Sequence, residues 1–196
     1  MRILVPRHLK VICTMKHLHN KRVGLFGCAG SGKTTFGKWL VHRTGATIRH
    51  EGVREWMQAK GIRRFSEISE AKYVELQKHL LRDMEKSDAQ IFDRTPVDVI
   101  AHLRAMSNRK WFEQEYQFAK STSEKIDLFL FFPFYSLFLE DDGYRIMDAA
   151  YQIEMGTSMI SVLTDFGLRD RILVFEHHRP YEENLVILDS ILGRLE

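Results

Sequence analysis

Residues 27–34 read Gly-Cys-Ala-Gly-Ser-Gly-Lys-Thr, with the G-x-x-x-x-G-K-[ST] spacing of a phosphate-binding loop. In such a loop, closely spaced glycines let consecutive backbone N–H groups converge on phosphate oxygens. Lys33 adds a mobile positive charge, and the Thr34 hydroxyl is a ligand type suited to Mg²⁺. The stretch therefore predicts a site for a nucleoside triphosphate with Mg²⁺; ATP is the expected nucleotide, although the sequence has no short signature that distinguishes ATP from GTP. The predicted nucleotide-binding residues are Gly27, Cys28, Ala29, Gly30, Ser31, Gly32, Lys33, Thr34 and Thr35.

The sequence on either side of this loop favours a real site over a chance match. An apolar run, residues 23–26, precedes the loop, and apolar residues 36, 39, 40 and 41 follow it at helical spacing. The loop thus connects a predicted strand to a predicted helix. Gly37, one turn into that helix, is expected to allow close packing on the sheet rather than ligand contact.

Strand-like and helix-like segments alternate along the rest of the chain. Helical periodicity covers residues 71–86 and 148–166. Another helix is expected to start at Pro96, after Thr95 as N-cap, and Gly167 is expected to end the 148–166 helix. Alternation of this kind predicts a three-layer α/β/α fold with a mostly parallel five-stranded sheet. The expected strands are residues 23–26, 46–48, 90–92, 126–132 and 172–175.

Composition indicates an ordinary globular protein. The chain has 196 residues, 44% of them hydrophobic, which suffices for one good core. Two cysteines are too few for a disulfide framework, so a reducing, cytoplasmic setting is expected. The longest apolar stretch, residues 129–134, is far too short to cross a membrane, and no membrane partner is predicted.

The first fifty residues carry ten lysines and arginines and no acidic residue, although the net charge of the whole chain is only +3. Such a leader could attract the phosphate backbone of nucleic acid. It resembles a transit peptide less well because residues 1–20 lack serine. We favour an incidental extension, since the chain could also start at Met15. The predicted division is a basic extension, residues 1–20, and one domain built around the phosphate loop, residues 21–196.

Asp93 ends the third apolar segment, at the edge of the sheet where the phosphate loop also lies. A carboxylate in this position holds Mg²⁺ or its water in many nucleotide-binding proteins, and the alternative is a surface turn. Arg94 follows directly. Its guanidinium suits a phosphate or carboxylate of a substrate, or a structural pairing with Asp98.

A second group of candidates follows the second predicted strand. Glu51, Arg54 and Glu55 lie within about one helical turn of one another. Transfer of a phosphoryl group to a hydroxyl needs a base or an orienting acid near the acceptor oxygen. Glu51 and Asp93 are competing candidates for that base, whereas Glu55 could equally be a carboxylate favoured at a helix N-terminus.

Two further features have open interpretations. Arg145 lies in a polar break after the fourth predicted strand, where a lid arginine could close over the transferred phosphoryl group. A solvated surface charge is the alternative. The nine histidines have no cysteine cluster or ligand spacing typical of a metal site, so no histidine metal site is predicted.

Taken in order, the phosphate loop, Glu51-x-x-Arg54-Glu55, Asp93-Arg94 and Asp142-Gly143-Tyr144-Arg145 resemble the small AAA-type P-loop ATPase and kinase domains of bacteria and phages. The nicotinamide-riboside kinase domain looks similar. Thymidylate and deoxynucleoside kinases are distantly similar, with an Asp-Arg or Glu-Arg pair after the third strand. The resemblance covers roughly residues 21–194.

This resemblance implies a role for each candidate. Phosphate binding falls to Gly30, Gly32, Lys33 and Thr34, and metal binding to Thr34 and Asp93. Acceptor contacts fall to Glu51, Arg54 and Arg94, and lid closure to Arg145; Lys33, Asp93, Glu51 and Arg145 form the implied catalytic set. Some phage relatives phosphorylate 5-hydroxymethyluracil within DNA, so DNA is kept as an alternative substrate.

The predicted function is transfer of the γ-phosphoryl group of ATP to a hydroxyl of a nucleoside-like or nucleotide-like acceptor. Two alternatives stay open. One is a kinase acting on DNA, for which no base-reading motif is present. The other is a regulatory ATPase or switch whose output is a conformational change.

Overall fold

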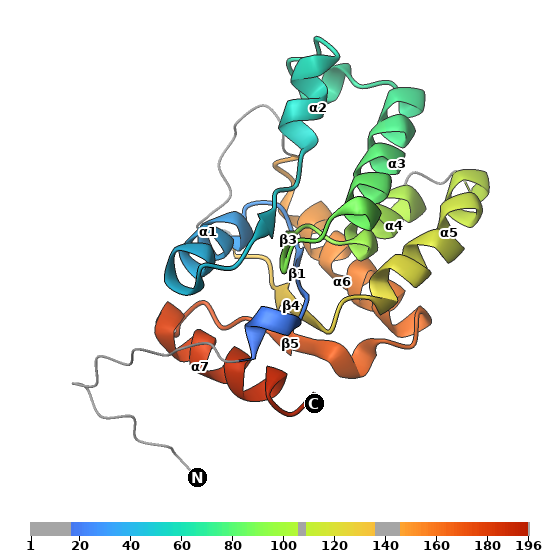
Figure 1. Cartoon of the computed structure of the whole chain (residues 1–196). Helices are drawn as coiled ribbons and strands as arrows, with labels where there is room; N and C mark the ends of the chain where they lie inside the picture. Colours follow the sequence, from blue (N-terminus) through green and yellow to red (C-terminus); the bar gives the residue numbers. More distant parts are fainter. Residues whose placement is uncertain (1–16, 106–108, 136–145, 196) are drawn as a thin grey trace.

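The computed structural model describes residues 17–105, 109–135 and 146–195. At its centre is a five-stranded parallel sheet with strand order β2-β3-β1-β4-β5 (Figure 1). All five predicted strands are present, with ends that differ by a few residues. They are β1 (Val23–Gly27), β2 (Ile48–Arg49), β3 (Ile91–Asp93), β4 (Leu128–Phe132) and β5 (Ile172–Val174).

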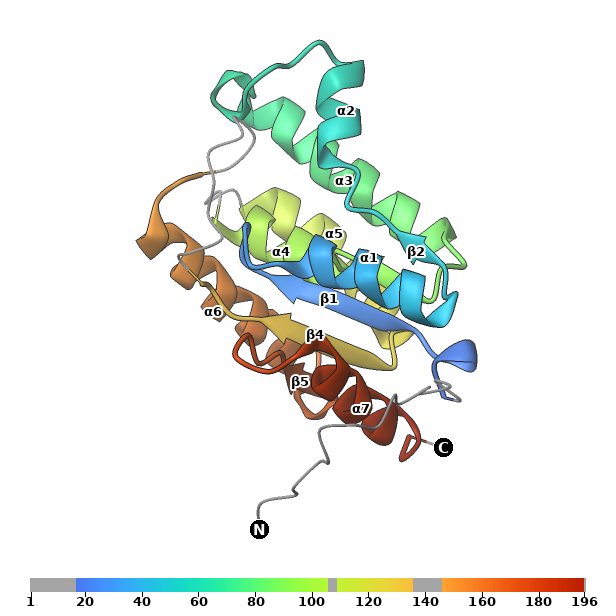
Figure 2. The ribbon, with the colours of Figure 1, turned by 90° about the vertical axis from the view of Figure 1, so that its left-hand side faces the viewer.

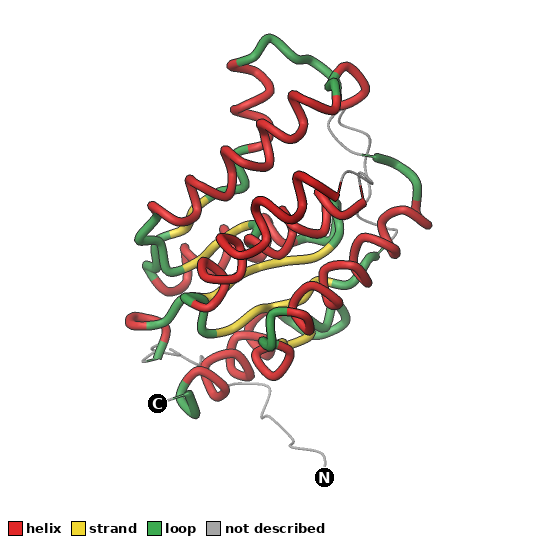
Figure 3. The backbone as a smooth tube through the Cα atoms, turned by 90° about the vertical axis from the view of Figure 1, so that its right-hand side faces the viewer, coloured by secondary structure: helices red, strands yellow, loops and turns green. Residues whose placement is uncertain are grey.

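Helices cover both faces of the sheet, which confirms the predicted three-layer α/β/α architecture. Helices α1 and α7 lie on one face (Figure 2), and α3, α4, α5 and α6 cover the other (Figure 3). The described helices are α1 (Lys33–Thr44), α2 (Val53–Ala59), α3 (Glu70–Lys86), α4 (Pro96–Ala105), α5 (Arg109–Glu124), α6 (Ala149–Asp165) and α7 (Tyr181–Leu192).

Side-chain alternation along the strands divides the core into two clusters. In β4, Leu128 and Leu130 face the cluster under α1 and α7, whereas Phe129 and Phe131 face the helices on the opposite side. Both faces of β4 are buried, so this strand is apolar throughout. Gly37 confirms its predicted packing role, because a Cβ there would lie 2.9 Å from Ile48 Cδ1.

The predicted helix boundaries are also found. Helix α4 starts at Pro96, and Gly167 follows α6 in the left-handed conformation, with φ of 76°. The capping contact differs in detail from the expectation. Asp98 Oδ2 accepts hydrogen bonds from both Thr95 N (2.9 Å) and Thr95 Oγ1 (2.7 Å), so the carboxylate supplies the acceptor.

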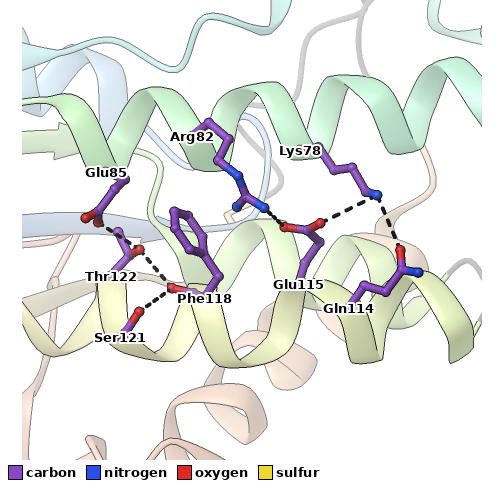
Figure 4. A network of polar contacts seen from close by, with 8 residues as sticks. All are labelled: Lys78, Arg82, Glu85, Gln114, Glu115, Phe118, Ser121 and Thr122. Carbon is purple, nitrogen blue, oxygen red and sulfur yellow. Dashed lines mark hydrogen bonds and ion pairs between the residues drawn. The ribbon is translucent and has the colours of Figure 1, made fainter.

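A polar network fixes α3 against α5 (Figure 4). The Glu115 carboxylate, 4% exposed, forms ion pairs with Arg82 Nη2 (2.8 Å) and Lys78 Nζ (3.5 Å). The Arg82 guanidinium also lies 3.8 Å from the centre of the Phe118 ring. Because the opposite side of α3 lines the functional cavity described below, this network helps to set the position of that wall.

Near its amino-terminal end, the described chain already joins the core. Leu18, within the segment predicted as an extension, is 1% exposed and belongs to the cluster that includes Leu188 and Leu192 of α7. No helix within the described ranges has both the length and the apolar character required to span a bilayer.

Candidate functional site

A cavity of about 430 Å³ opens at the carboxyl ends of the central strands. The phosphate loop, residues 28–35, forms its floor between two differently built sides. One side contains Glu51 and Arg94 with residues of α3, α4 and α6, and is called here the acceptor half. The other contains Phe175, His177 and Tyr181, and is called the base half.

The backbone of the phosphate loop requires its glycines. Gly27, Gly30 and Gly32 have φ values of 130°, 68° and 85°, which residues with a Cβ rarely adopt. At Gly27 there is also no room, because a Cβ would lie 2.2 Å from the backbone oxygen of Phe132. Helix α1 begins at Lys33, so its N-terminal amides face the same space as the loop.

The Lys33 side chain lies over the loop. Its Nζ donates hydrogen bonds to the carbonyl oxygens of Gly27 (2.9 Å) and Cys28 (2.6 Å), and to Ser31 Oγ (3.3 Å). These contacts hold an ammonium group beside the backbone amides that would bind phosphate. A phosphate oxygen could therefore accept both a loop N–H and the lysine charge.

Thr34 and Asp93 are joined by a hydrogen bond, so their oxygens are close enough to contact one metal ion. Thr34 Oγ1 donates to Asp93 Oδ2 at 2.7 Å. Asp93 Oδ1 is buried and has no hydrogen-bond partner in the described part of the chain. Burial raises the pKa of the Asp93 carboxyl, while the Lys33 charge and the Thr34 hydrogen bond act in the opposite direction. The Thr34 hydroxyl and the Asp93 carboxylate are oxygen ligands of the kind that a hard cation such as Mg²⁺ prefers.

Arg94 has an unusual backbone. Its φ of 93° is the only positive value among the described non-glycine residues. The side chain is 9% exposed and lines the acceptor half, where Nη2 donates to Gln77 Oε1 at 3.3 Å. Its Nε is buried without a partner among described residues. No direct ion pair joins Arg94 to Asp98 within these ranges, but the Arg94 charge acts on Asp98 from a distance: burial raises the pKa of the Asp98 carboxyl, and Arg94 opposes this shift.

The other residues predicted from the sequence differ in whether they line the cavity. Glu51 is partly buried and lines the same cavity as Arg94. Arg54 is on the exposed side of α2 and is not among the lining residues; Glu55 is also exposed there. Arg145 lies outside the described residues. The structure thus brings Glu51, Asp93 and Arg94 to the phosphate loop, but not Arg54.

Several residues of the acceptor half were not singled out from the sequence. They come from α3, α4 and α6 and are mainly aromatic, apolar or uncharged polar. His102 stands out because its Nδ1 is buried without a partner among described residues. Burial and the charges of Arg94 and Lys33 hold the pKa of His102 well below its usual value. The additional residues are Phe65, Tyr73, Leu76, Gln77, His102, Tyr151, Met155 and Met159.

The base half is aromatic. The His177 ring lies 5.1 Å from the Phe175 ring and stacks on Tyr135 at 5.2 Å. Tyr181 packs edge-on against Phe175 at 6.0 Å. Burial lowers the pKa of His177, so a neutral imidazole is favoured. A planar, uncharged nucleobase could stack in these surroundings.

A parallel sheet with a glycine-rich loop between β1 and α1, and a strand-end aspartate on the loop threonine, defines a P-loop protein with a kinase-like fold. A family profile described as an AAA domain matches residues 22–178. The chain belongs to this AAA domain family, as the sequence motifs indicated. Comparison with curated protein sequences gives no significant match.

Solved structures support the same fold. The NadR protein in complex with NR aligns over 90% of this chain at 20% identity, with a TM-score of 0.72. This chain corresponds to 53% of that one, about half its length. Deoxyadenosine kinase from M. mycoides, with products dCMP and dCDP, has a TM-score of 0.64 at 12% identity, over 88% of this chain and 99% of the kinase. Shikimate kinase from Acinetobacter baumannii has a TM-score of 0.57 at 13% identity, over 92% and 98%.

Proposed function

We propose that this protein is an ATP-dependent kinase that transfers the γ-phosphoryl group to a hydroxyl of a nucleoside-like acceptor. The observation that supports it is one cavity in which the phosphate loop lies between an aromatic base half and an acceptor half containing Glu51 and Arg94. A protein that only hydrolyses ATP has no need for an acceptor half beside the loop. Similar folds occur in structures of NadR with NR and of deoxyadenosine kinase with dCMP.

In this proposal the phosphate loop positions the triphosphate. The loop amides and the N-terminus of α1 bind the phosphate oxygens, and the Lys33 ammonium offsets charge on the transferred group. Thr34 and Asp93 would hold Mg²⁺, which supplies positive charge to the phosphates when bound. The buried, unpartnered Oδ1 of Asp93 is consistent with this assignment.

The geometry favours different roles for the two candidate bases. Asp93 is 1% exposed and is already bonded to Thr34, so it suits the metal. Glu51 is partly buried, lines the acceptor half and is better placed to accept a proton from an incoming hydroxyl. We therefore assign the base to Glu51. Arg94, fixed by Gln77, would contact the acceptor.

The lining of the acceptor half favours an uncharged planar compound. Among described lining residues, the charged ones are Lys33, Glu51 and Arg94, and Lys33 is committed to the loop. An acceptor that carries its own phosphate would find only one positive side chain in this half, Arg94, and one negative side chain, Glu51, which would repel it. Aromatic and methionine side chains suit a heterocyclic ring instead, and Gln77 and His102 offer hydrogen bonds to its edge. A free nucleoside is thus favoured over a nucleotide or a DNA strand.

A coupled assay of ADP release tests the proposal. The full chain with ATP and Mg²⁺ is given no acceptor, a panel of nucleosides, the matching monophosphates, or DNA containing hydroxymethyl bases. We expect acceptor-dependent ADP release with a nucleoside, and Glu51→Gln should lower kcat by about 100-fold or more. Glu55→Gln is the matched control, because Glu55 lies four residues further on, is exposed on α2 and does not line the cavity.

Each other outcome identifies an alternative. ADP release that no acceptor changes would support a regulatory ATPase. Radiolabel from γ-labelled ATP in polymeric DNA, with none in free nucleosides, would support the DNA kinase. Equal effects of the two glutamate substitutions would remove Glu51 from its assigned role.

A further inference from the structure

Gln152 on α6 joins the phosphate loop to the chain before that helix. It is 3% exposed, and both ends of its side-chain amide are bonded. Oε1 accepts a hydrogen bond from the Ala29 backbone N–H at 3.0 Å, and Nε2 donates to the backbone oxygen of Ile146 at 2.7 Å. One phosphate-loop amide is therefore already engaged by a side chain of the protein.

The position of Ala29 indicates which phosphate would compete for this amide. A nucleotide with its base near Phe175 and His177 must direct its phosphate tail across the loop towards Glu51 and Arg94. Gln152 belongs to α6, whose residues 151, 155 and 159 line the acceptor half. The phosphate nearest to Gln152 is then the terminal one of ATP, which ADP lacks. An amide oxygen 3.0 Å from a loop N–H occupies a position suited to a phosphate oxygen.

Helix α6 is attached to the loop independently of this side chain. Cys28 Sγ donates to the backbone oxygen of Gln152 at 2.7 Å. One turn later, Gly156 leaves space for the same sulfur, since a Cβ there would lie 3.0 Å from it. The Gln152 side chain can therefore leave Ala29 without displacement of the helix.

We propose that Gln152 is a positioning residue that distinguishes ATP from ADP, with its side-chain oxygen replaced at the Ala29 N–H by an oxygen of the terminal phosphoryl group. The inference rests on the proposed nucleotide site. When the phosphate replaces Oε1, the amide of Gln152 reorients, and its bond to Ile146 changes with it. Binding of the triphosphate is thereby coupled to the backbone at the start of α6.

Paired substitutions test this proposal through the ratio of ATP to ADP affinity. Gln152→Met keeps the approximate size but removes the competing oxygen, so ATP should bind about fivefold more tightly while ADP changes little. Gln152→Glu keeps an acceptor for Ala29 but places a negative charge beside the terminal phosphate. ATP should then bind at least about fivefold more weakly, again with little change for ADP. Ile153→Gln, at a position 56% exposed on the same helix, is the control.

Calorimetric Kd values for the full chain with Mg²⁺ separate the outcomes. Opposite shifts of the ATP/ADP ratio in the two variants support the proposal. Equal changes for ATP and ADP in both variants would make Gln152 a structural residue and overturn it. If wild-type protein binds neither nucleotide, the proposed function fails first, and the two failures are thus distinguishable.

A measurement on unaltered protein avoids dependence on how the variants fold. The side-chain NH₂ signals of Gln152 and the amide signal of Ala29 can be followed by ¹⁵N NMR during titration. We expect AMP-PNP to shift both sets of signals and ADP to leave the Gln152 NH₂ signals nearly in place. Identical shifts with both nucleotides, or none at Gln152 with either, would contradict the proposal.

Discussion

Arg94 allows a direct test of whether the site stores backbone strain. Its φ of 93° is costly for any residue with a Cβ, by about 1–3 kcal/mol, and such strain concentrates at functional sites. Arg94→Ala and Arg94→Gly both remove the hydrogen bond to Gln77 and the cavity contact. They differ only in the Cβ. Glycine relieves the strain but costs about 0.5–1 kcal/mol in backbone entropy, so the glycine variant should be more stable by about 1 kcal/mol.

Equilibrium urea unfolding of the nucleotide-free variants measures this difference. One kcal/mol corresponds to about 2–4 °C in Tm for a chain of this size, so thermal unfolding can check it. Both variants should raise the KM for the acceptor, because the guanidinium is missing in each. An alanine variant as stable as the glycine variant, or more stable, would refute the assignment of strain to this position.

Three further predictions concern the metal site, the loop and the helix pair. Asp93→Asn should stabilise the nucleotide-free protein at pH 7 by about 0.5–2 kcal/mol while it abolishes transfer. Burial raises the pKa of the Asp93 carboxyl, so in wild type this carboxyl binds a proton as the pH falls and the cost of its buried charge decreases. The stabilisation by Asp93→Asn, measured by urea unfolding, should therefore be smaller at pH 4.5 than at pH 7. Gly27→Ala should lower the free energy of unfolding by more than about 4 kcal/mol in the same assay. Gly45→Ala is the control: a Cβ there meets no other atom, so only the positive φ is unfavourable and the loss should be about 1–2 kcal/mol. Equal losses would contradict the steric argument. Arg82→Ala should cost about 1–3 kcal/mol in thermal or urea unfolding, since it removes the closer of two cations from the buried Glu115 carboxylate; no loss would contradict this.

The fold was largely predictable because its signals are local. The central strands β1 and β4 are short apolar runs buried along their whole length, and the phosphate loop fixes where β1 ends and α1 begins. Helices α5 and α7 were not predicted. In α5 the apolar residues Phe112, Tyr116 and Ala119 recur at helical spacing, so the signal was present. The strand order depends on long-range pairing and cannot be seen in local periodicity.

The candidate site was predictable only where a motif or a strand end marks it. Asp93 ends β3 and Glu51 follows β2, and both strands end at the same sheet edge, so their convergence on the loop could be expected. Gln77, His102 and Gln152 meet there through the packing of three helices, which the sequence does not specify. The position of Arg54 depends on the rotational phase of the short helix α2, which places this residue on the exposed side of the helix and outside the cavity lining. The positive φ of Arg94 has no sequence signal.

The proposed function depends on binding of the phosphate tail of a nucleoside triphosphate by the loop around Lys33. Isothermal titration of the purified full chain with ATP and Mg²⁺, beside Lys33→Ala, tests it most directly. We predict saturable one-to-one binding by wild type and a loss of at least about tenfold in affinity in the variant, because a charge-assisted contact to phosphate is removed. Absence of binding by wild type to ATP and GTP alike, or an affinity that the substitution leaves unchanged, would contradict the account.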